Sequence, residues 1–233
     1  MRLGLIGWGV ASGNGGMNTD IACLASYVTK WLIPTHPKLP LHSPYIEKAK
    51  NSVHLSFVNP GDNYDECIDA FCKNIDGVIY IEHPIFNLAE YTYNVVDRIH
   101  SNGKKVYAIP MWEWWPEEEH WALETDCIWS VTNYTARYLR SLVDVLESRG
   151  VQPKWKKHIF GDRWGVNLDD FEYRQRNTAQ HIVFVRGNAG YKDRKAGKLI
   201  IPALIELARD SEYKITCHSQ ADMSHYTNGQ NPN

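Results

Sequence analysis

Short apolar segments alternate with helix-like segments along almost the whole chain, and this alternation constrains the fold more than any other feature of the sequence. Unbroken runs rich in β-branched residues, such as 77–81, predict strands that are buried on both faces. The segments between such runs carry apolar residues at helical spacing. Because strand–helix–strand repeats favour parallel pairing, the sequence predicts an α/β protein with a Rossmann-like parallel sheet and helices on both faces.

The predicted elements divide the chain into two domains. The first, residues 1–175, has predicted strands at 3–8, 53–58, 77–81, 105–109, 126–131 and 158–160, and predicted helices at 19–32, 64–72, 88–100 and 135–148. A proline-rich stretch from Pro34 to Pro44 predicts a surface loop, and the polar segment 172–178 predicts a linker. Residues 176–233 then start a second Rossmann-like domain, with strands at 181–185 and 213–217 around a helix at 196–209. Two strands and one helix cannot cover a sheet, so we expect this second domain to be incomplete and to be the place of any oligomer contact.

Charge and composition exclude several classes of protein. The 233 residues include 25 Lys and Arg against 27 Asp and Glu, a net charge of −2, which gives no strong signal for nucleic-acid binding. No apolar run approaches the roughly 20 residues that span a bilayer, and no signal-peptide pattern opens the chain, so we expect a cytoplasmic protein without a transmembrane segment. The five cysteines lack C-x-x-C spacing, which favours free buried thiols over a metal site or a disulfide.

Glycines cluster between the first predicted strand and its helix. Segment 7–17 contains Gly15 and Gly16, which would let backbone amides approach a ligand, and the start of the next helix would favour an anion. A dinucleotide site is disfavoured, because this loop is longer than a G-x-G-x-x-G turn and no acidic residue closes the strand at 53–58. A substrate-binding loop and a purely structural turn remain as alternatives.

Two candidate catalytic residues follow neighbouring predicted strands. His83 comes two residues after the strand at 77–81 and suits an acid, a base or a hydrogen-bond donor, the alternative being a structural loop histidine. Glu113 follows the strand at 105–109 and lies between Trp112 and Trp114. Aromatic rings stack on sugars and carboxylates accept from hydroxyls, so this segment predicts a sugar site, with a core tryptophan cluster as the alternative. We assign Trp112, Trp114 and Asn14 to acceptor binding.

Cationic side chains flank a glycine-containing loop in the second domain. Arg186 ends the predicted strand, and Arg194 and Lys195 directly precede the predicted helix. Cations beside a helix start suit a diphosphate leaving group, which gains negative charge as its bond to carbon breaks. The alternative is that these side chains are merely solvated.

These segments, in this order, resemble the retaining GT-B glycosyltransferases, the group that includes sucrose synthases and many bacterial mannosyl- and glucosyltransferases. Segment 164–171 (WGVNLDDF) is similar to the Gly-Val-Asp-then-Phe stretch that ends the first domain of that family. Gly15-Gly16-Met17 resembles its N-terminal glycine loop, and 130–135 (SVTNYT) its serine-then-helix segment. Arg186 with 194–197 (RKAG) resembles the Arg and Lys-Gly pair that holds the donor diphosphate.

The resemblance implies a GT-B-like fold in which residues 1–175 bind an acceptor and residues 176–233 bind a nucleotide-diphosphate sugar. It implies transfer of a hexose in the cleft between the domains, with retention and without a metal or other cofactor. The residues that would meet the diphosphate charge are Arg186, Arg194, Lys195, Gly15 and Gly16. Glu113 and His83 are equal candidates for the catalytic residue.

Two other functions stay open. A truncated or non-catalytic fragment of such an enzyme would bind an acceptor or a partner without turnover, and an exposed apolar sheet face beside 182–185 would favour it. A Rossmann-type nucleotide-binding protein with a different activity is the third hypothesis.

Overall fold

The structure is a computed structural model that describes residues 1–10, 13–35, 40–81, 94–110, 119–161, 181–187, 197–210 and 214–219. The chain divides into two compact units, Met1–Asp170 and Phe171–Asn233, which we describe separately. The division falls five residues before the boundary expected from the sequence, while the acceptor and donor roles of the two domains remain predictions.

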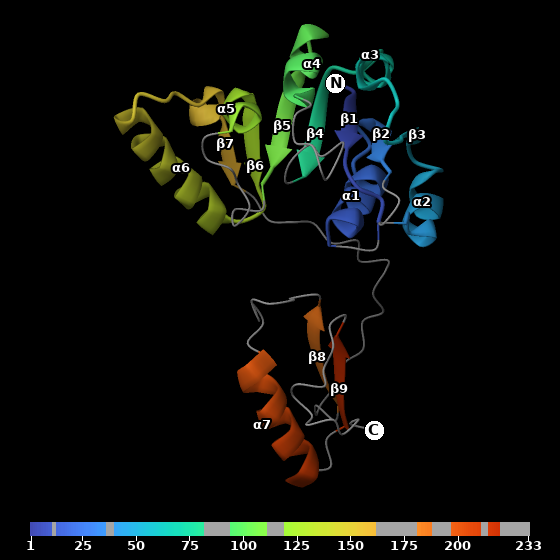
Figure 1. Cartoon of the computed structure of the whole chain (residues 1–233), viewed down its shortest axis with the longest axis vertical. Helices are drawn as coiled ribbons and strands as arrows, with labels where there is room; N and C mark the ends of the chain where they lie inside the picture. The colour runs from blue at the N-terminus through green and yellow to red at the C-terminus, as the bar shows by residue number, and fades with distance from the viewer. Residues whose placement is uncertain are drawn as a thin grey trace. The chain divides into compact units, whose positions relative to one another are not determined.

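The first unit is built on a seven-stranded sheet in which every pair of neighbouring strands is parallel (Figure 1). The strands are β1 (Leu3–Ile6), β2 (Val28–Pro34), β3 (His54–Val58), β4 (Gly77–Ile81), β5 (Lys105–Ile109), β6 (Cys127–Ser130) and β7 (Ile159–Gly161). Their order across the sheet is β3-β2-β1-β4-β5-β6-β7, so the direction of winding reverses between β1 and β4. This order is that of a doubly wound Rossmann-like sheet and confirms the predicted α/β class.

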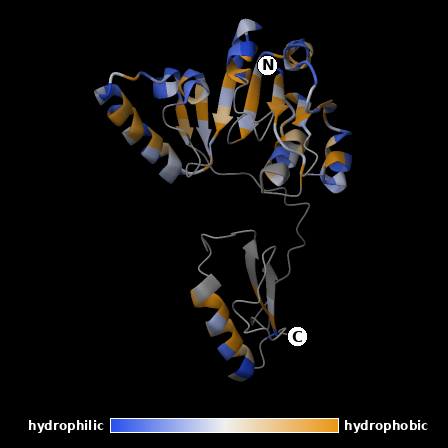
Figure 2. Cartoon of the chain, in the orientation of Figure 1, coloured by the Kyte–Doolittle hydropathy of each residue, from blue (hydrophilic) through white to orange (hydrophobic). Residues whose placement is uncertain are grey.

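Helices cover both faces of this sheet and form two apolar cores. The helices are α1 (Gly13–Leu24), α2 (Ser43–Ala49), α3 (Tyr64–Cys72), α4 (Val95–Ser101), α5 (His120–Glu124) and α6 (Asn133–Ser148), followed by the short 3-10 helix η2 (Lys154–Lys157). In one core α1 and α2 pack on Leu5, Trp31 and Ile79; in the other α3 to α6 pack on Tyr80 and Ile128. Figure 2 shows the apolar character of the strands between these two layers.

The predicted helix at 19–32 is correct as far as Leu24 and wrong beyond it. The helix α1 ends at Leu24, and the chain turns and enters β2 at Val28, next to β1. Trp31 and Ile33 are completely buried in one core, and Leu32 is buried in the other. A strand buried on both faces needs apolar residues at successive positions, and such a run also satisfies helical spacing, so periodicity alone did not separate the two.

Several other elements agree with the prediction. The elements α3, β4 and β5 have the predicted bounds, and Thr132 caps α6 by accepting a hydrogen bond from the Thr135 amide at 3.1 Å. The predicted proline-rich loop is shorter than expected, because Pro34 ends β2 and Pro44 lies in the first turn of α2. Proline is tolerated there because first-turn amides have no partner within the helix.

The second unit contains one β-α-β segment in the part that is described. The strands β8 (His181–Gly187) and β9 (Lys214–Ser219) pair in parallel, and α7 (Gly197–Asp210) connects them in sequence. Val183 on β8 is 53% exposed and Leu199 on α7 is 77% exposed.

Two further observations concern the whole of the described part of the chain. None of the helices there is long and apolar enough to span a bilayer. Cys23, Cys67, Cys72 and Cys127 are free thiols; Cys72 is buried and the other three are half-buried, whereas the side chain of Cys217 lies outside the described part.

Candidate functional site

The candidate site lies at the carboxyl end of β1, where the strand order of the sheet reverses. In open α/β sheets, ligands bind outside the carboxyl ends of the strands at this reversal point. The segment that leaves β1 begins at Gly7 and reaches α1 at Gly13. Residues 7–10 of this connection are described, and we call them the β1 turn.

Hydrogen bonds from three neighbouring elements hold the β1 turn in place. The Gly7 amide donates to the Leu32 carbonyl at 3.2 Å, and the Trp31 indole Nε1 donates to the Gly7 carbonyl at 3.0 Å. The Asn18 side-chain Nδ2 donates to the Trp8 carbonyl at 3.2 Å. The His42 amide donates to the Gly9 carbonyl at 2.7 Å, so β2, α1 and the residue before α2 all fix the turn.

The glycines of the β1 turn are needed for packing. A Cβ atom on Gly7 would lie 2.3 Å from Asn18 Nδ2 and 2.4 Å from Asn18 Oδ1, distances that no side chain tolerates. A Cβ atom on Gly9 would lie 2.9 Å from Ile46 Cδ1 of α2. These two glycines therefore let α1 and α2 approach the end of β1 closely.

We predict that Gly7→Ala destabilises the protein by about 1–3 kcal/mol, because the added methyl group must displace the buried Asn18 side chain and its hydrogen bond. Urea unfolding followed by circular dichroism measures this change. The matched control is Gly16→Ala, where the nearest contact of the new methyl group would be the Tyr45 hydroxyl at 3.3 Å. Equal stability of Gly7→Ala and the wild-type protein would contradict the packing role assigned to Gly7.

The predicted glycine loop extends too far along the chain. Gly15 and Gly16 lie in the first turn of α1, which begins at Gly13. A helix leaves its first amides without partners inside the helix, so this turn can still present N–H groups to an anion. Gly15 and Gly16 therefore belong to a helix start and not to a loop, and Gly16 faces Tyr45 of α2.

Two buried polar atoms next to the β1 turn have no hydrogen-bond partner among the described residues. They are Asn18 Oδ1, in a residue that is 1% exposed, and His42 Nδ1. The His42 ring lies against the Tyr45 ring, with centroids 4.3 Å apart and planes at 59°. Buried polar atoms are almost always paired in folded proteins, so these two mark where the site offers unused hydrogen-bonding capacity.

Sequence reasoning missed Asn18, His42 and Tyr45. Asn18 had a weak signal, since it is a polar residue at a position of α1 that packs against the sheet. No local pattern marks His42 or Tyr45. His42 reaches the β1 turn and Tyr45 reaches Gly16 of α1 only because α2 folds back beside them, with Val10 and Leu41 forming a β-bridge.

The structure describes the strand ends that precede the predicted catalytic residues. Ile81 and Ile109, the last residues of β4 and β5, are register partners, so the segments with His83 and Glu113 leave the sheet from adjacent positions. His83, Trp112, Glu113 and Trp114 themselves lie outside the described residues. Asn14 belongs to the first turn of α1, and its side chain is outside the described part.

The cationic residues of the second unit are only partly described. The backbone of Arg186 lies in β8, one residue before its end, and its side chain is outside the described part. Arg194 and Lys195 lie outside the described residues. Within the described ranges, no group of three or more His, Cys, Asp and Glu side chains is arranged to hold a metal ion.

The strand order and the helix start behind β1 define the first unit as a Rossmann-like α/β domain with an anion-suited turn at its switch point. Comparison of the chain with protein-family models, curated proteins and solved structures gave no match.

Proposed function

We propose that the protein is a retaining GT-B glycosyltransferase that moves a hexose from a nucleotide-diphosphate sugar to an acceptor molecule. The observation that carries this proposal is the glycine-bearing first turn of α1 at the switch point of a doubly wound sheet. A second β-α-β segment with parallel strands, later in the same chain, supports it. The motif 164–171 and the cations around 186–195 join these two parts in the order of that family.

In this proposal the first unit binds the acceptor and the second binds the nucleotide sugar. Arg186, Arg194 and Lys195 stabilise the diphosphate as it leaves, and the first-turn amides at Gly15 and Gly16 add donors. Cationic side chains and helix amides then do the work that a metal ion does in other transferases. Attack takes place on the face from which the diphosphate departs, so the anomeric configuration is retained.

Two other functions are distinguishable from this one. A dinucleotide-binding protein of the same topology needs an acidic residue at the end of β2 for the ribose, and this chain has Pro34 and Thr35 there. A chain that binds an acceptor or partner without turnover is favoured by the exposure of Val183 and Leu199 in the second unit.

A donor-hydrolysis screen with UDP-, GDP- and ADP-sugars tests the proposal directly. We expect the whole chain to bind one nucleoside diphosphate in calorimetry and to release it slowly from the matching sugar donor. Nucleoside diphosphate binding without any release, with or without candidate acceptors, favours the binding-only function. Binding of NAD(H) or NADP(H) in place of all three diphosphates contradicts the proposal.

We predict that Gly16→Ala separates ligand binding from folding. The substitution adds a helix-favouring residue to α1, so stability should be unchanged or rise by up to about 1 kcal/mol. The new methyl group would fill the space between the first turn of α1 and the Tyr45 hydroxyl, 3.3 Å away, and narrow the approach to the first-turn amides, so the affinity for the nucleoside diphosphate should fall about tenfold. Calorimetry and urea unfolding on the same variant measure both quantities. Unchanged affinity would exclude this helix start from the donor site.

A further inference from the structure

A cavity of about 240 Å³ opens beside β5, β6 and β7, at the opposite end of these strands from the candidate site. Lys105 is the first residue of β5, and Asp126 and His158 directly precede β6 and β7; all three line the cavity. The proposed substrate site uses the carboxyl ends of the strands, so this cavity is a separate feature of the first unit.

The floor of the cavity is one face of the sheet. Tyr107 on β5 is the register partner of Cys127 on β6, and Phe160 follows on β7. The alternate residues Ile128 and Ile159 belong to the core on the opposite face. Phe160 is 59% exposed, so its ring is open to a ligand.

The polar atoms on this floor carry no charge at neutral pH. Burial raises the pKa of the Cys127 thiol to about 11, and the charge of Asp126 adds to this effect. Burial likewise raises the pKa of the Tyr107 hydroxyl. The floor therefore offers two aromatic rings and a neutral thiol, which suit an aromatic ring better than an ionic group.

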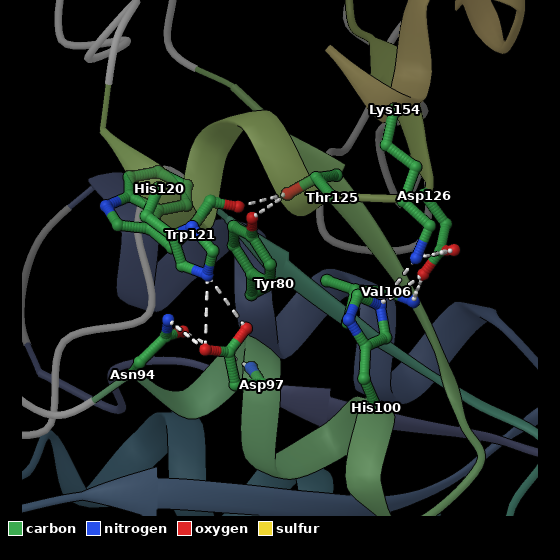
Figure 3. Close-up of polar contacts among 10 residues, drawn as sticks. All are labelled: Tyr80, Asn94, Asp97, His100, Val106, His120, Trp121, Thr125, Asp126 and Lys154. Atoms are coloured by element: carbon green, nitrogen blue, oxygen red, sulfur yellow. Dashed lines mark hydrogen bonds and ion pairs between the residues drawn. The ribbon is translucent and has the colours of Figure 1, made fainter. Parts of the chain in front are cut away.

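Asp126, the carboxylate among the described residues that line the cavity, is already paired (Figure 3). Asp126 Oδ1 lies 2.9 Å from Lys154 Nζ, and Asp126 Oδ2 lies 2.7 Å from His100 Nε2 and accepts from the Val106 amide at 2.8 Å. Burial disfavours the charged form of Asp126 and by itself would raise its pKa. The hydrogen bonds from Lys154, Val106 and His100 outweigh burial and hold the pKa below its usual value. Its negative charge is thus compensated from inside the protein.

Two further side chains on the rim of the cavity can still bind a ligand. The ammonium group of Lys105 and the imidazole of His158 are exposed, and neither has a hydrogen-bond or ion-pair partner in the part of the chain that the structure describes. Lys154 faces the same cavity from η2. The charge of Lys154 is paired with Asp126, so among the described lining residues the charge of Lys105 stays uncompensated and makes the rim net positive.

We propose that this cavity binds a small aromatic phosphomonoester, with its ring over Tyr107 and Phe160 and its phosphate at Lys105, Lys154 and His158. Lysine ammonium groups bind phosphate as point charges, and the aromatic floor positions the ring. The volume lies below the roughly 300–1,000 Å³ of pockets for drug-sized ligands, which restricts the ligand to about one ring and one phosphate. The proposal does not depend on glycosyltransferase activity.

Phenyl phosphate is the probe that tests this site, titrated calorimetrically into the whole chain. Inorganic phosphate and benzyl alcohol serve as its charged and aromatic halves. We expect phenyl phosphate to bind at least about tenfold more tightly than either half, because only the whole molecule uses both rim and floor. Higher ionic strength should weaken its binding.

Matched variants assign the binding to the cavity. Lys105→Met should weaken phenyl phosphate binding about tenfold, and Phe160→Ala about threefold to tenfold. Lys73→Met, which changes an exposed lysine beyond the end of α3, should leave it unchanged. In the wild-type protein, the probe should shift the amide resonances of Tyr107 and Cys127, a readout that needs no variant.

Three outcomes overturn the proposal. One is equal affinity for phenyl phosphate and inorganic phosphate, and another is an equal loss in Lys105→Met and Lys73→Met. The third is binding of the chain to phosphatidylserine-containing vesicles with no binding of phenyl phosphate, which would assign the patch to a lipid surface instead.

Discussion

Glu113→Gln is expected to lower kcat for donor turnover by about 10²–10⁴-fold, because the amide can neither take up a proton nor stabilise positive charge at the sugar carbon. The folding free energy should change little, since glutamine has nearly the same shape as glutamate. Steady-state release of the nucleoside diphosphate, with the best donor from the screen, measures the effect.

The comparison variant for Glu113 is His83→Gln, because both residues follow adjacent strand ends and have equal standing as catalytic candidates. We expect the larger loss of kcat to identify the catalytic residue. The other residue should show a change mainly in KM if it positions the acceptor. Full activity in both variants would mean that neither Glu113 nor His83 takes part in the reaction.

Lys195→Ala is expected to weaken binding of the nucleoside diphosphate by about 10–100-fold, the usual loss when one charge-assisted hydrogen bond to phosphate disappears. Turnover should fall as well, because the negative charge on the diphosphate grows as the bond to the sugar breaks. Calorimetry with the nucleoside diphosphate separates the first effect from the second.

Lys192→Ala serves as the control for Lys195→Ala, since Lys192 belongs to the same loop and has the same charge. It also tests whether Lys192 rather than Lys195 binds the phosphate, because the variant that lacks the ligand should lose about tenfold more affinity than the other variant. Equal small losses in both variants would mean that this loop is only a solvated positive surface.

The elements that could be predicted from the sequence are those in which local pattern and tertiary environment agree. The helix α3 has an Asn63 cap whose side chain accepts from the Glu66 amide, and one apolar face, so its bounds follow from nearby residues. The strand β4 is a continuous apolar run after Gly77, and β5 is a short apolar run that follows Lys105. In contrast, the apolar pattern predicts a helix across residues 28–32 of β2, because a strand that is buried on both faces also satisfies helical spacing.

Some residues of the candidate site could likewise be predicted from the sequence, and others could not. The sequence placed His83 and Glu113 after two strands, and the pairing of Ile81 with Ile109 makes those strand ends neighbours. It also identified the glycine-rich segment, but not that Gly16 belongs to a helix. His42 and Tyr45 lie about 30 residues away along the chain from that segment, and no local rule relates them to it.

The α/β class follows from the sequence pattern alone, because alternating apolar strands and helices admit few arrangements other than a parallel sheet with helices on both faces. The residues around the β1 turn and the cavity beside β5, β6 and β7 are known only from the folded structure. Asn18 packs against Gly7, and Lys105 and His158 line the same cavity, because strand pairing and helix packing bring together residues far apart in the sequence. Such contacts form only when elements that are far apart in the sequence bury apolar surface against one another. The residues next to each partner in the sequence therefore cannot predict them.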